Sequence, residues 1–110
     1  MASWRGVDGT VQYFGQILLA GGRSIDGSLT LTSGKRSPFE QMRLYDAYLA
    51  RGKTGIPVAY PGTSLHEMGL AFDLARPRID PFQDPLLAYL GQIWRSWGGG
   101  WSPSDPVHFQ

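Results

Sequence analysis

Glycine and proline most strongly limit what this chain can fold into. Its 110 residues include 15 glycines and 8 prolines, about a fifth of the chain. Both residue types favour turns and interrupt regular elements, so we expect short helices and strands joined by many loops. The hydrophobic fraction of 42% against 17% charged residues still provides a core, because disordered chains are poor in apolar residues. This length is typical of one domain, which we predict over residues 1–110.

Three segments have the sequence signals of helices. The first runs from about Gly9 to Ala20, with Gly21 and Gly22 expected to end it. The second begins at a capping box and stops at Gly52, and the third is opened by a capping Asp and a Pro and ended by Gly98 to Gly100. The inward residues expected on the three helices are Val11, Phe14 and Leu18; Met42, Tyr45 and Leu49; and Leu86, Leu90, Ile93, Trp94 and Trp97.

Strands are expected between these helices. Residues 28–32 alternate polar and apolar side chains, which predicts a half-buried strand. Residues 70–74 are predicted to form a buried strand and residues 105–110 a final strand. Residues 57–60 fit a further short extended piece. The mixed order of helices and strands predicts an α+β domain with a small antiparallel sheet and about three helices.

Charge and composition exclude several kinds of partner and site. The chain has no cysteine, which rules out disulfides, thiolate zinc sites and cysteine nucleophiles. The net charge is +1, so we expect no nucleic-acid or membrane partner. No apolar stretch approaches the roughly 18 residues of a membrane helix, and the first residues lack the apolar run of a secretory signal. A metal would have to bind His, Asp or Glu.

The two histidines, His66 and His108, each lie near a carboxylate. Asp73 follows His66 by seven residues, so the two side chains meet only if the chain turns between them, and Gly69 offers that turn. Two histidines and one carboxylate form a ligand set of catalytic zinc. Asp105 precedes His108 by three residues and is a candidate general base and acid.

Several of the remaining residues have more than one possible role at this point. Asp105 is also placed to cap the turn at Ser104–Asp105–Pro106. Arg36 is a candidate partner for a polarised carbonyl or a substrate carboxylate, or a solvated charge beside Lys35. Trp94, Trp97 and Trp101 fit the core better than a sugar-stacking platform. Glu67 is not part of a His-Glu-x-x-His helix and is not assigned as the base.

Three blocks in order resemble one family. They are Thr32 to Gln41, with a Gly-x-Arg-Ser pattern at residues 34–37; Pro61 to Asp73, with a Ser-x-His-x-x-Gly-x-Ala-x-Asp pattern; and Trp97 to Phe109, ending in Asp-x-x-His-Phe. Together they resemble the zinc D-alanyl-D-alanine carboxypeptidase and L-alanyl-D-glutamate endopeptidase family. That family includes vancomycin-resistance carboxypeptidases and bacteriophage endolysins.

The resemblance implies a fold and a set of roles. The fold is the small antiparallel sheet flanked by helices of the Hedgehog/DD-peptidase type. Zinc would bind His66, Asp73 and His108, and Asp105 would be the catalytic acid and base where many relatives have Glu. Arg36 would polarise the scissile carbonyl or stabilise the intermediate. Ser64 would contact substrate or brace the site, unless it is only a turn residue.

The expected function is a monomeric zinc metallopeptidase that cleaves stem peptides of bacterial peptidoglycan. An endolysin-type L-alanyl-D-glutamate endopeptidase is preferred, present in the host cytoplasm until its release to the cell wall, or carried on the virion. The alternatives are a D-alanyl-D-alanine carboxypeptidase, a non-catalytic zinc-containing wall-binding module, and a metal-independent structural protein.

Overall fold

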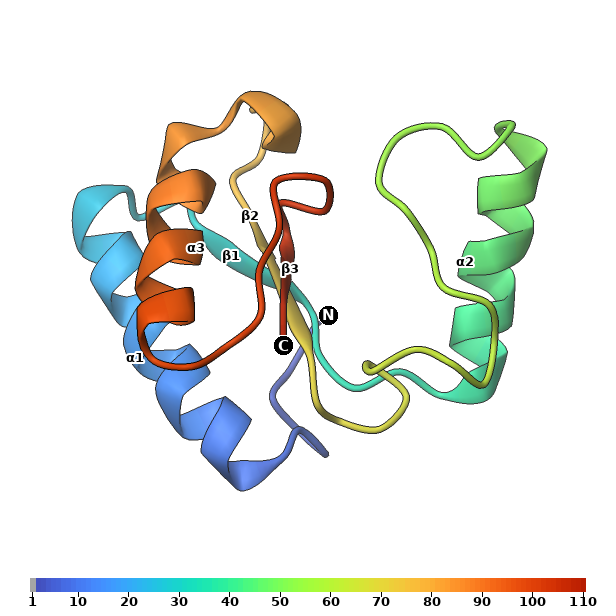
Figure 1. Ribbon diagram of the computed structural model, residues 1–110, viewed down its shortest axis with the longest axis horizontal. Helices are drawn as coiled ribbons and strands as arrows, with labels where there is room; N and C mark the ends of the chain where they lie inside the picture. Colours follow the sequence, from blue (N-terminus) through green and yellow to red (C-terminus); the bar gives the residue numbers. More distant parts are fainter. Residues whose placement is uncertain (1) are drawn as a thin grey trace.

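A computed structural model describes residues 2–110, which form three α-helices, one short 3-10 helix and one three-stranded sheet (Figure 1). In chain order the elements are α1 (Gly9–Ile25), β1 (Thr30–Ser33), α2 (Pro38–Ala50), β2 (Phe72–Ala75), η1 (Pro81–Gln83), α3 (Pro85–Ser96) and β3 (His108–Phe109). The strands are antiparallel in the order β1-β2-β3. The α+β fold predicted from the sequence is confirmed. Within residues 2–110 no helix has the length and apolarity needed to cross a membrane.

The helix starts follow the capping signals. Ser37 accepts from the Glu40 backbone N–H and the Glu40 carboxylate accepts from the Ser37 N–H, which forms the predicted capping box of α2. At α3 the Asp84 side chain accepts from the Leu86 N–H, and Pro85 occupies the first turn. These local signals set where both helices begin.

Helix α1 runs further than predicted. Gly21 and Gly22 do not end it, and it continues to Ile25. Gly22 allows close packing, because a Cβ at this position would collide with the Leu29 side chain. The buried stripe of α1 includes Gly15 and Leu18, which leaves Phe14 at its exposed edge, so the predicted inward position of Phe14 is wrong.

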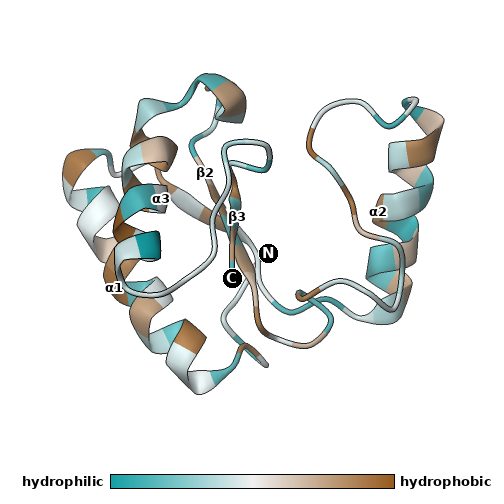
Figure 2. Cartoon of the chain, in the orientation of Figure 1, coloured by the Kyte–Doolittle hydropathy of each residue, from teal (hydrophilic) through white to brown (hydrophobic). Residues whose placement is uncertain are grey.

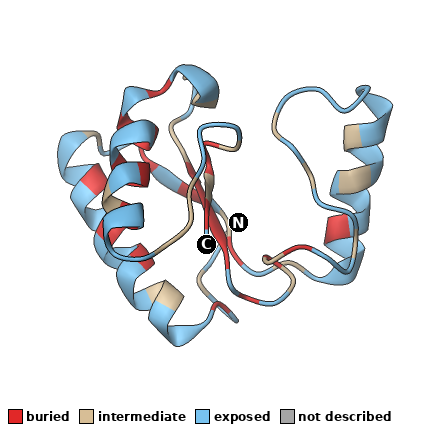
Figure 3. Ribbon diagram, viewed as in Figure 1, coloured by how far each residue is buried: buried red, intermediate tan, exposed pale blue. Residues whose placement is uncertain are grey.

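The core lies where α1 and α3 pack beside the sheet (Figures 2 and 3). Brown, apolar segments and red, buried segments concentrate in these elements in the two views. Trp94 is buried and Trp101 packs against the core, but Trp97 is 45% exposed because it is the C-cap residue beyond the last turn of α3. Trp97 therefore does not belong to the core. Residues that form the core are Leu18, Leu19, Leu29, Leu31, Phe72, Leu74, Leu86, Leu87, Leu90, Trp94, Val107 and Phe109.

Helix α2 stands apart from this core. Its one buried residue is the polar Gln41, which is 0% exposed. The predicted inward positions of Met42 and Leu49 are wrong, since each is 45% exposed. Tyr45 is partly covered, and its ring meets that of Tyr60 in the segment after the helix. Residues 57–60 form no strand. Apolar spacing alone therefore overestimated how much of α2 is buried.

Strand alternation divides the sheet into an apolar face and a polar face. Phe72 and Leu74 are fully buried in the core, and Asp73 between them points to the opposite face. Strand β3 repeats the division, since Phe72 pairs with Phe109 and Asp73 pairs with His108. The polar pair faces the space between the sheet and α2, where the candidate site lies.

Candidate metal centre and catalytic cleft

A tight turn brings His66 back to the sheet. Gly69 has a φ of +72°, and a Cβ at this position would collide with the Gly6 carbonyl oxygen. The chain therefore turns between His66 and Asp73 at the glycine from which the turn was predicted. His66 is 2% exposed, so its imidazole is held inside the protein.

Three candidate ligand atoms converge at this point. His66 Nε2 lies 2.9 Å from Asp73 Oδ1 and 3.2 Å from His108 Nδ1, and the last two atoms are 3.5 Å apart. Ligand atoms at about 2.0–2.1 Å from a tetrahedral zinc lie roughly 3.3 Å from one another. The donor types and their separations therefore fit a zinc ion held by His66, Asp73 and His108.

Both imidazoles are oriented by a hydrogen bond on the other ring nitrogen. His66 Nδ1 lies 2.8 Å from the Gly34 carbonyl oxygen, which can only accept a hydrogen bond, so Nδ1 carries the proton and Nε2 is free to bind a metal. His108 Nε2 lies 2.8 Å from Gln110 Oε1, so Nδ1 is its free atom. Neither Gly34 nor Gln110 was assigned a role at the site from the sequence. Gly34 acts through its backbone carbonyl on a histidine 32 residues away, and Gln110, two residues after His108, belongs to no motif.

His66, Asp73 and His108 form a triad of candidate metal ligands, and the charges around this triad favour an ionised Asp73. Burial would raise the pKa of this carboxyl, but hydrogen bonds with His108 and His66 and the charge of Arg36 lower it to about 2. Burial would lower the pKa of His108, yet its bonds with Asp73 and Gln110 raise it. The triad thus holds a carboxylate whose negative charge suits a cation.

Arg36 connects the sheet, the triad and α2. Its Nε donates to Ser33 Oγ at 2.9 Å, one terminal nitrogen to Gln41 Oε1 at 3.1 Å, and the other to Asp73 Oδ2 at 2.9 Å. A β-bulge between Leu31 and Ser33 places Ser33 opposite Asp73, on the polar face. Arg36 lines the cleft, as predicted, and is not a solvated surface charge.

Gln41 is a site residue that the sequence reasoning missed. It accepts from Arg36, and its side-chain amide donates to the Ala59 carbonyl at 2.9 Å. These bonds join α2 to both the arginine and the loop that lines the cleft. The signal that could have indicated it is its place at the end of the first sequence block, as the fourth residue of the capped helix. Gln41 is polar and lies outside the apolar stripe predicted for this helix, so its burial was not expected.

Asp105 offers an unused carboxylate next to the triad. Its Oδ1 is buried and has no hydrogen-bond partner within residues 2–110. Burial raises the pKa of the Asp105 carboxyl. Its backbone closes a turn with Ser102, but its side chain forms no hydrogen bond there within the described residues, which argues against the alternative role as a turn cap.

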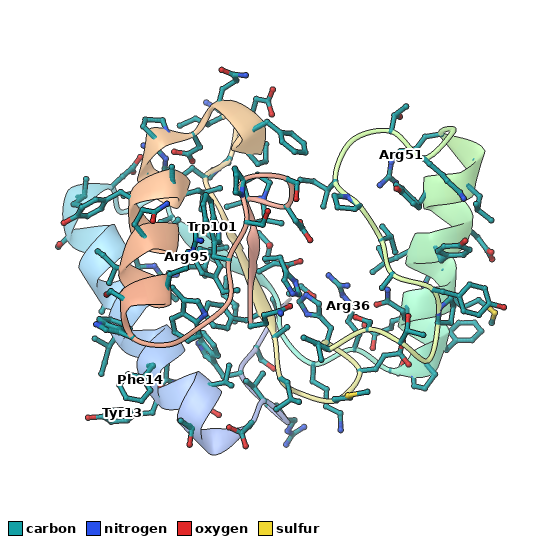
Figure 4. The ribbon with its side chains drawn as sticks, in the orientation of Figure 1. Tyr13, Phe14, Arg36, Arg51, Arg95 and Trp101 are labelled. Carbon is teal, nitrogen blue, oxygen red and sulfur yellow. The ribbon has the colours of Figure 1, made fainter. Side chains whose placement is uncertain are left out.

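One cleft of about 810 Å³ contains all the predicted site residues. It is lined by Arg36, Ser64, His66, Asp73, Asp105 and His108, and its outer walls include Ile56 to Ala59 and Trp101. Figure 4 shows Arg36 pointing into the space between the sheet and α2, whereas Trp101 lies on the α3 side of the sheet. Ser64 is buried and its hydroxyl accepts from the His66 N–H at 3.2 Å, so it braces the turn that holds the histidine.

Comparison with known proteins was made at the level of sequence and of structure. Neither a protein-family model nor a curated protein matches the chain. Among solved structures, the Zn(II) complex of a mutant of the vancomycin-resistance D,D-pentapeptidase VanY is 25% identical, with a TM-score of 0.69 over 100% of this chain and 76% of that one. VanYB in complex with D-alanine-D-alanine is 23% identical, with a TM-score of 0.72 over 94% of this chain and 70% of that one.

A third structure extends the same likeness. The LdcB LD-carboxypeptidase, whose structure reveals how that protein recognises peptidoglycan, is 19% identical, with a TM-score of 0.75 over 100% of this chain and 69% of that one. This chain has the fold of the VanY and LdcB peptidases. The resemblance drawn from the three sequence blocks is confirmed. Zinc as the expected metal is supported both by the Zn(II) complex of VanY and by the His66, Asp73 and His108 donor set.

Proposed function

We propose that this chain is a zinc-dependent peptidase that hydrolyses stem peptides of bacterial peptidoglycan. The observation that carries the proposal is the convergence, in one cleft, of a two-histidine, one-aspartate donor set with the half-buried Asp105, whose buried Oδ1 has no hydrogen-bond partner within residues 2–110. A purely structural metal site needs no such carboxylate, whereas hydrolysis needs a group that moves protons.

Each group in the cleft has a chemical role in this proposal. Zinc bound to the triad would supply Lewis-acid polarisation of a carbonyl and activation of water. Asp105 accepts the proton of the attacking water and returns it to the leaving amine. Three of the five N–H groups of Arg36 are bonded to protein, and the other two are available for the carbonyl oxygen on which charge develops.

The finer form of the proposal is an endolysin-type L-alanyl-D-glutamate endopeptidase. It rests on the sequence resemblance, and so do the expected places of action: host cytoplasm followed by the cell wall, or the virion. A D-alanyl-D-alanine carboxypeptidase is the second candidate. It is favoured by the likeness to VanYB bound to D-alanine-D-alanine. A non-catalytic wall-binding module is less favoured, because it leaves the unpaired Asp105 without a use.

The test is to digest purified sacculi with zinc-loaded protein and identify the products by mass spectrometry. New alanine and glutamate termini would support the endopeptidase, and released D-alanine would support the carboxypeptidase. Asp105→Asn keeps size and zinc ligands but accepts no proton, so hydrolysis should fall by about 10²–10⁴-fold while zinc content is unchanged. Equal rates for wild type and Asp105→Asn would remove Asp105 from the mechanism.

A further inference from the structure

Arg51 lies at the far end of the cleft from the triad. It is the C-cap residue of α2 and lines the same cavity as Arg36, His66 and Asp105. Figure 4 shows it beside the loop that follows α2, away from Arg36. The proposed chemistry at the triad makes no use of this second cation.

The guanidinium of Arg51 is held in place by the loop around it. Its Nε donates to the Thr54 carbonyl at 2.7 Å and a terminal nitrogen donates to the Ile56 carbonyl at 2.9 Å. The group also lies over the Tyr48 ring, 5.1 Å from its centroid. An arginine fixed in this way loses little conformational entropy when it binds a ligand.

The positive charge of Arg51 has no acidic partner among the described residues. Within residues 2–110 it forms no ion pair, and two carbonyl bonds leave three of its five N–H donors unused. The unused donors suit a planar anion, which arginine binds through paired hydrogen bonds. The unused donors and the charge of Arg51 therefore fit a carboxylate.

The wall between Arg51 and the triad suits an extended peptide. No intramolecular hydrogen bond is formed, within the described residues, by the backbone N–H groups of Ile56, Val58, Ala59 and Tyr60. Ile56 to Ala59 line the cleft. A peptide that lies along this wall can accept main-chain hydrogen bonds from it, as strands added to a sheet edge do.

We propose that Arg51 binds a free carboxylate of the peptide substrate at a position remote from the scissile bond; this rests on the proposed function. Stem peptides offer two sources of this group, the carboxylate of the D-glutamyl residue and the C-terminal carboxylate. Arg51 determines specificity, because an amidated peptide presents no charge to it. It contributes to binding and takes no part in the bond cleavage at the triad.

The experiment compares three synthetic stem pentapeptides with lysine as third residue. One has both carboxylates free, one has the D-glutamyl carboxylate amidated, and one has the C-terminal carboxylate amidated. Dissociation constants are measured by calorimetry on zinc-loaded protein that carries Asp105→Asn, with and without Arg51→Gln. Steady-state hydrolysis is measured on the same variants without the Asp105 change. Arg95→Gln, an exposed arginine in the last turn of α3, is the matched control.

Arg51→Gln should weaken binding of the fully free peptide about tenfold and raise KM with kcat little changed. The effect should vanish for the one amidated peptide that lacks the carboxylate contacted, which identifies the source. An equal loss for all three peptides would overturn the proposal and leave Arg51 as a brace of its loop. So would a loss no larger than that of Arg95→Gln. If the glutamine variant fails to fold, Arg51→Lys takes its place. Lysine keeps the charge but lacks the planar pair of donors, so a smaller loss is expected that still vanishes for the same amidated peptide, and an equal loss for all three peptides would again overturn the proposal.

Binding and hydrolysis separate this inference from the proposed function. Peptides that bind to wild type but are never cleaved would refute the peptidase, while the calorimetric arm would still decide the role of Arg51. Cleavage that is indifferent to Arg51 would refute the inference alone.

Discussion

The two faces of the β2–β3 pair carry opposite kinds of side chain at paired positions. On one face Phe72 and Phe109 are fully buried and stacked, with ring centroids 5.3 Å apart and planes 9° from parallel. On the other, Asp73 and His108 reach the cleft and meet His66. The same backbone pairing thus sets both core packing and the metal site. A slip of one residue would exchange the faces and destroy both.

The largest expected effect is on the polar face alone. His66→Ala removes one ligand, so zinc affinity should fall by more than about 100-fold, beyond the loss typical for partners that only orient a ligand. Hydrolysis should be lost with the metal, and thermal stability should fall to that of the chelator-treated wild type. Metal analysis and thermal unfolding check this. Full zinc occupancy in the variant would contradict the ligand assignment.

The apolar face is tested by Phe109→Ala. Removing a fully buried ring should lower the free energy of unfolding by about 3–5 kcal/mol, measured by denaturant titration. Phe39→Ala on α2, where the ring is 65% exposed, is the matched control and should cost less than about 0.5 kcal/mol. Similar losses for both variants would show that α2 is packed more tightly than the structure indicates.

The difference between α2 and the other helices shows what sequence reasoning reached in the fold. Caps at Ser37 and Asp84 are local, and both helix starts were predicted from them. Burial is not local: the spacing of Met42 and Leu49 matches an inward stripe, yet each of these side chains is 45% exposed. Gly22 has the local pattern of a helix C-terminus, but its role is to permit close packing against Leu29, and this contact cannot be predicted from the sequence.

The site divides in a similar way. The sequence blocks indicated His66, Asp73 and His108, and the structure brings these three together. The partners that orient the two histidines were not assigned: the Gly34 carbonyl is 32 residues from His66, and Gln110 belongs to no motif. Such contacts depend on the register of the sheet and on one turn, so spacing could not predict them.

A smaller effect links the polar face to α2. Arg36→Lys keeps the charge, but an ammonium cannot bond Ser33, Gln41 and Asp73 together in the geometry of a guanidinium. Because Arg36 orients a metal ligand, we expect a loss of about 10–100-fold in activity or zinc affinity. Hydrogen exchange along α2 should also become faster, since Arg36 and Gln41 attach this helix to the site. Wild-type kinetics and exchange would show that these bonds contribute little.

The smallest expected effect lies outside the site, at an ion-pair network around Arg76, the residue that follows β2. Arg76 donates to Asp26 at 3.0 Å and to Asp84 at 2.5–3.0 Å, joining the end of α1 to the start of α3. Hydrogen bonds from Ser28 and then from Arg76 lower the pKa of Asp26 to about 2. Burial would raise the pKa of Asp84, but its bonds with Arg76 and the Leu86 N–H lower it.

The sign of the pH dependence follows from these directions. The pKa of Asp26 in the folded protein lies below its ordinary value of 3.8, so its contribution to stability is present above about pH 5 and is lost as the pH falls toward 2. In the Asp26→Asn variant the free energy of unfolding should therefore depend less steeply on pH between 4 and 2 than in wild type, measured by denaturant titration of zinc-free protein.

The control is Asp46→Asn. Asp46 is an exposed α2 carboxylate without an ion pair in residues 2–110, so this variant should keep the wild-type slope. If Asp26→Asn also keeps it, the acid sensitivity arises at Asp73 or Asp84, and Asp26 is only a solvated cap. Because the Asp26 side chain is 33% exposed and solvent screens its charge, its effect should be the smallest of these, and its failure would leave the two-face comparison intact.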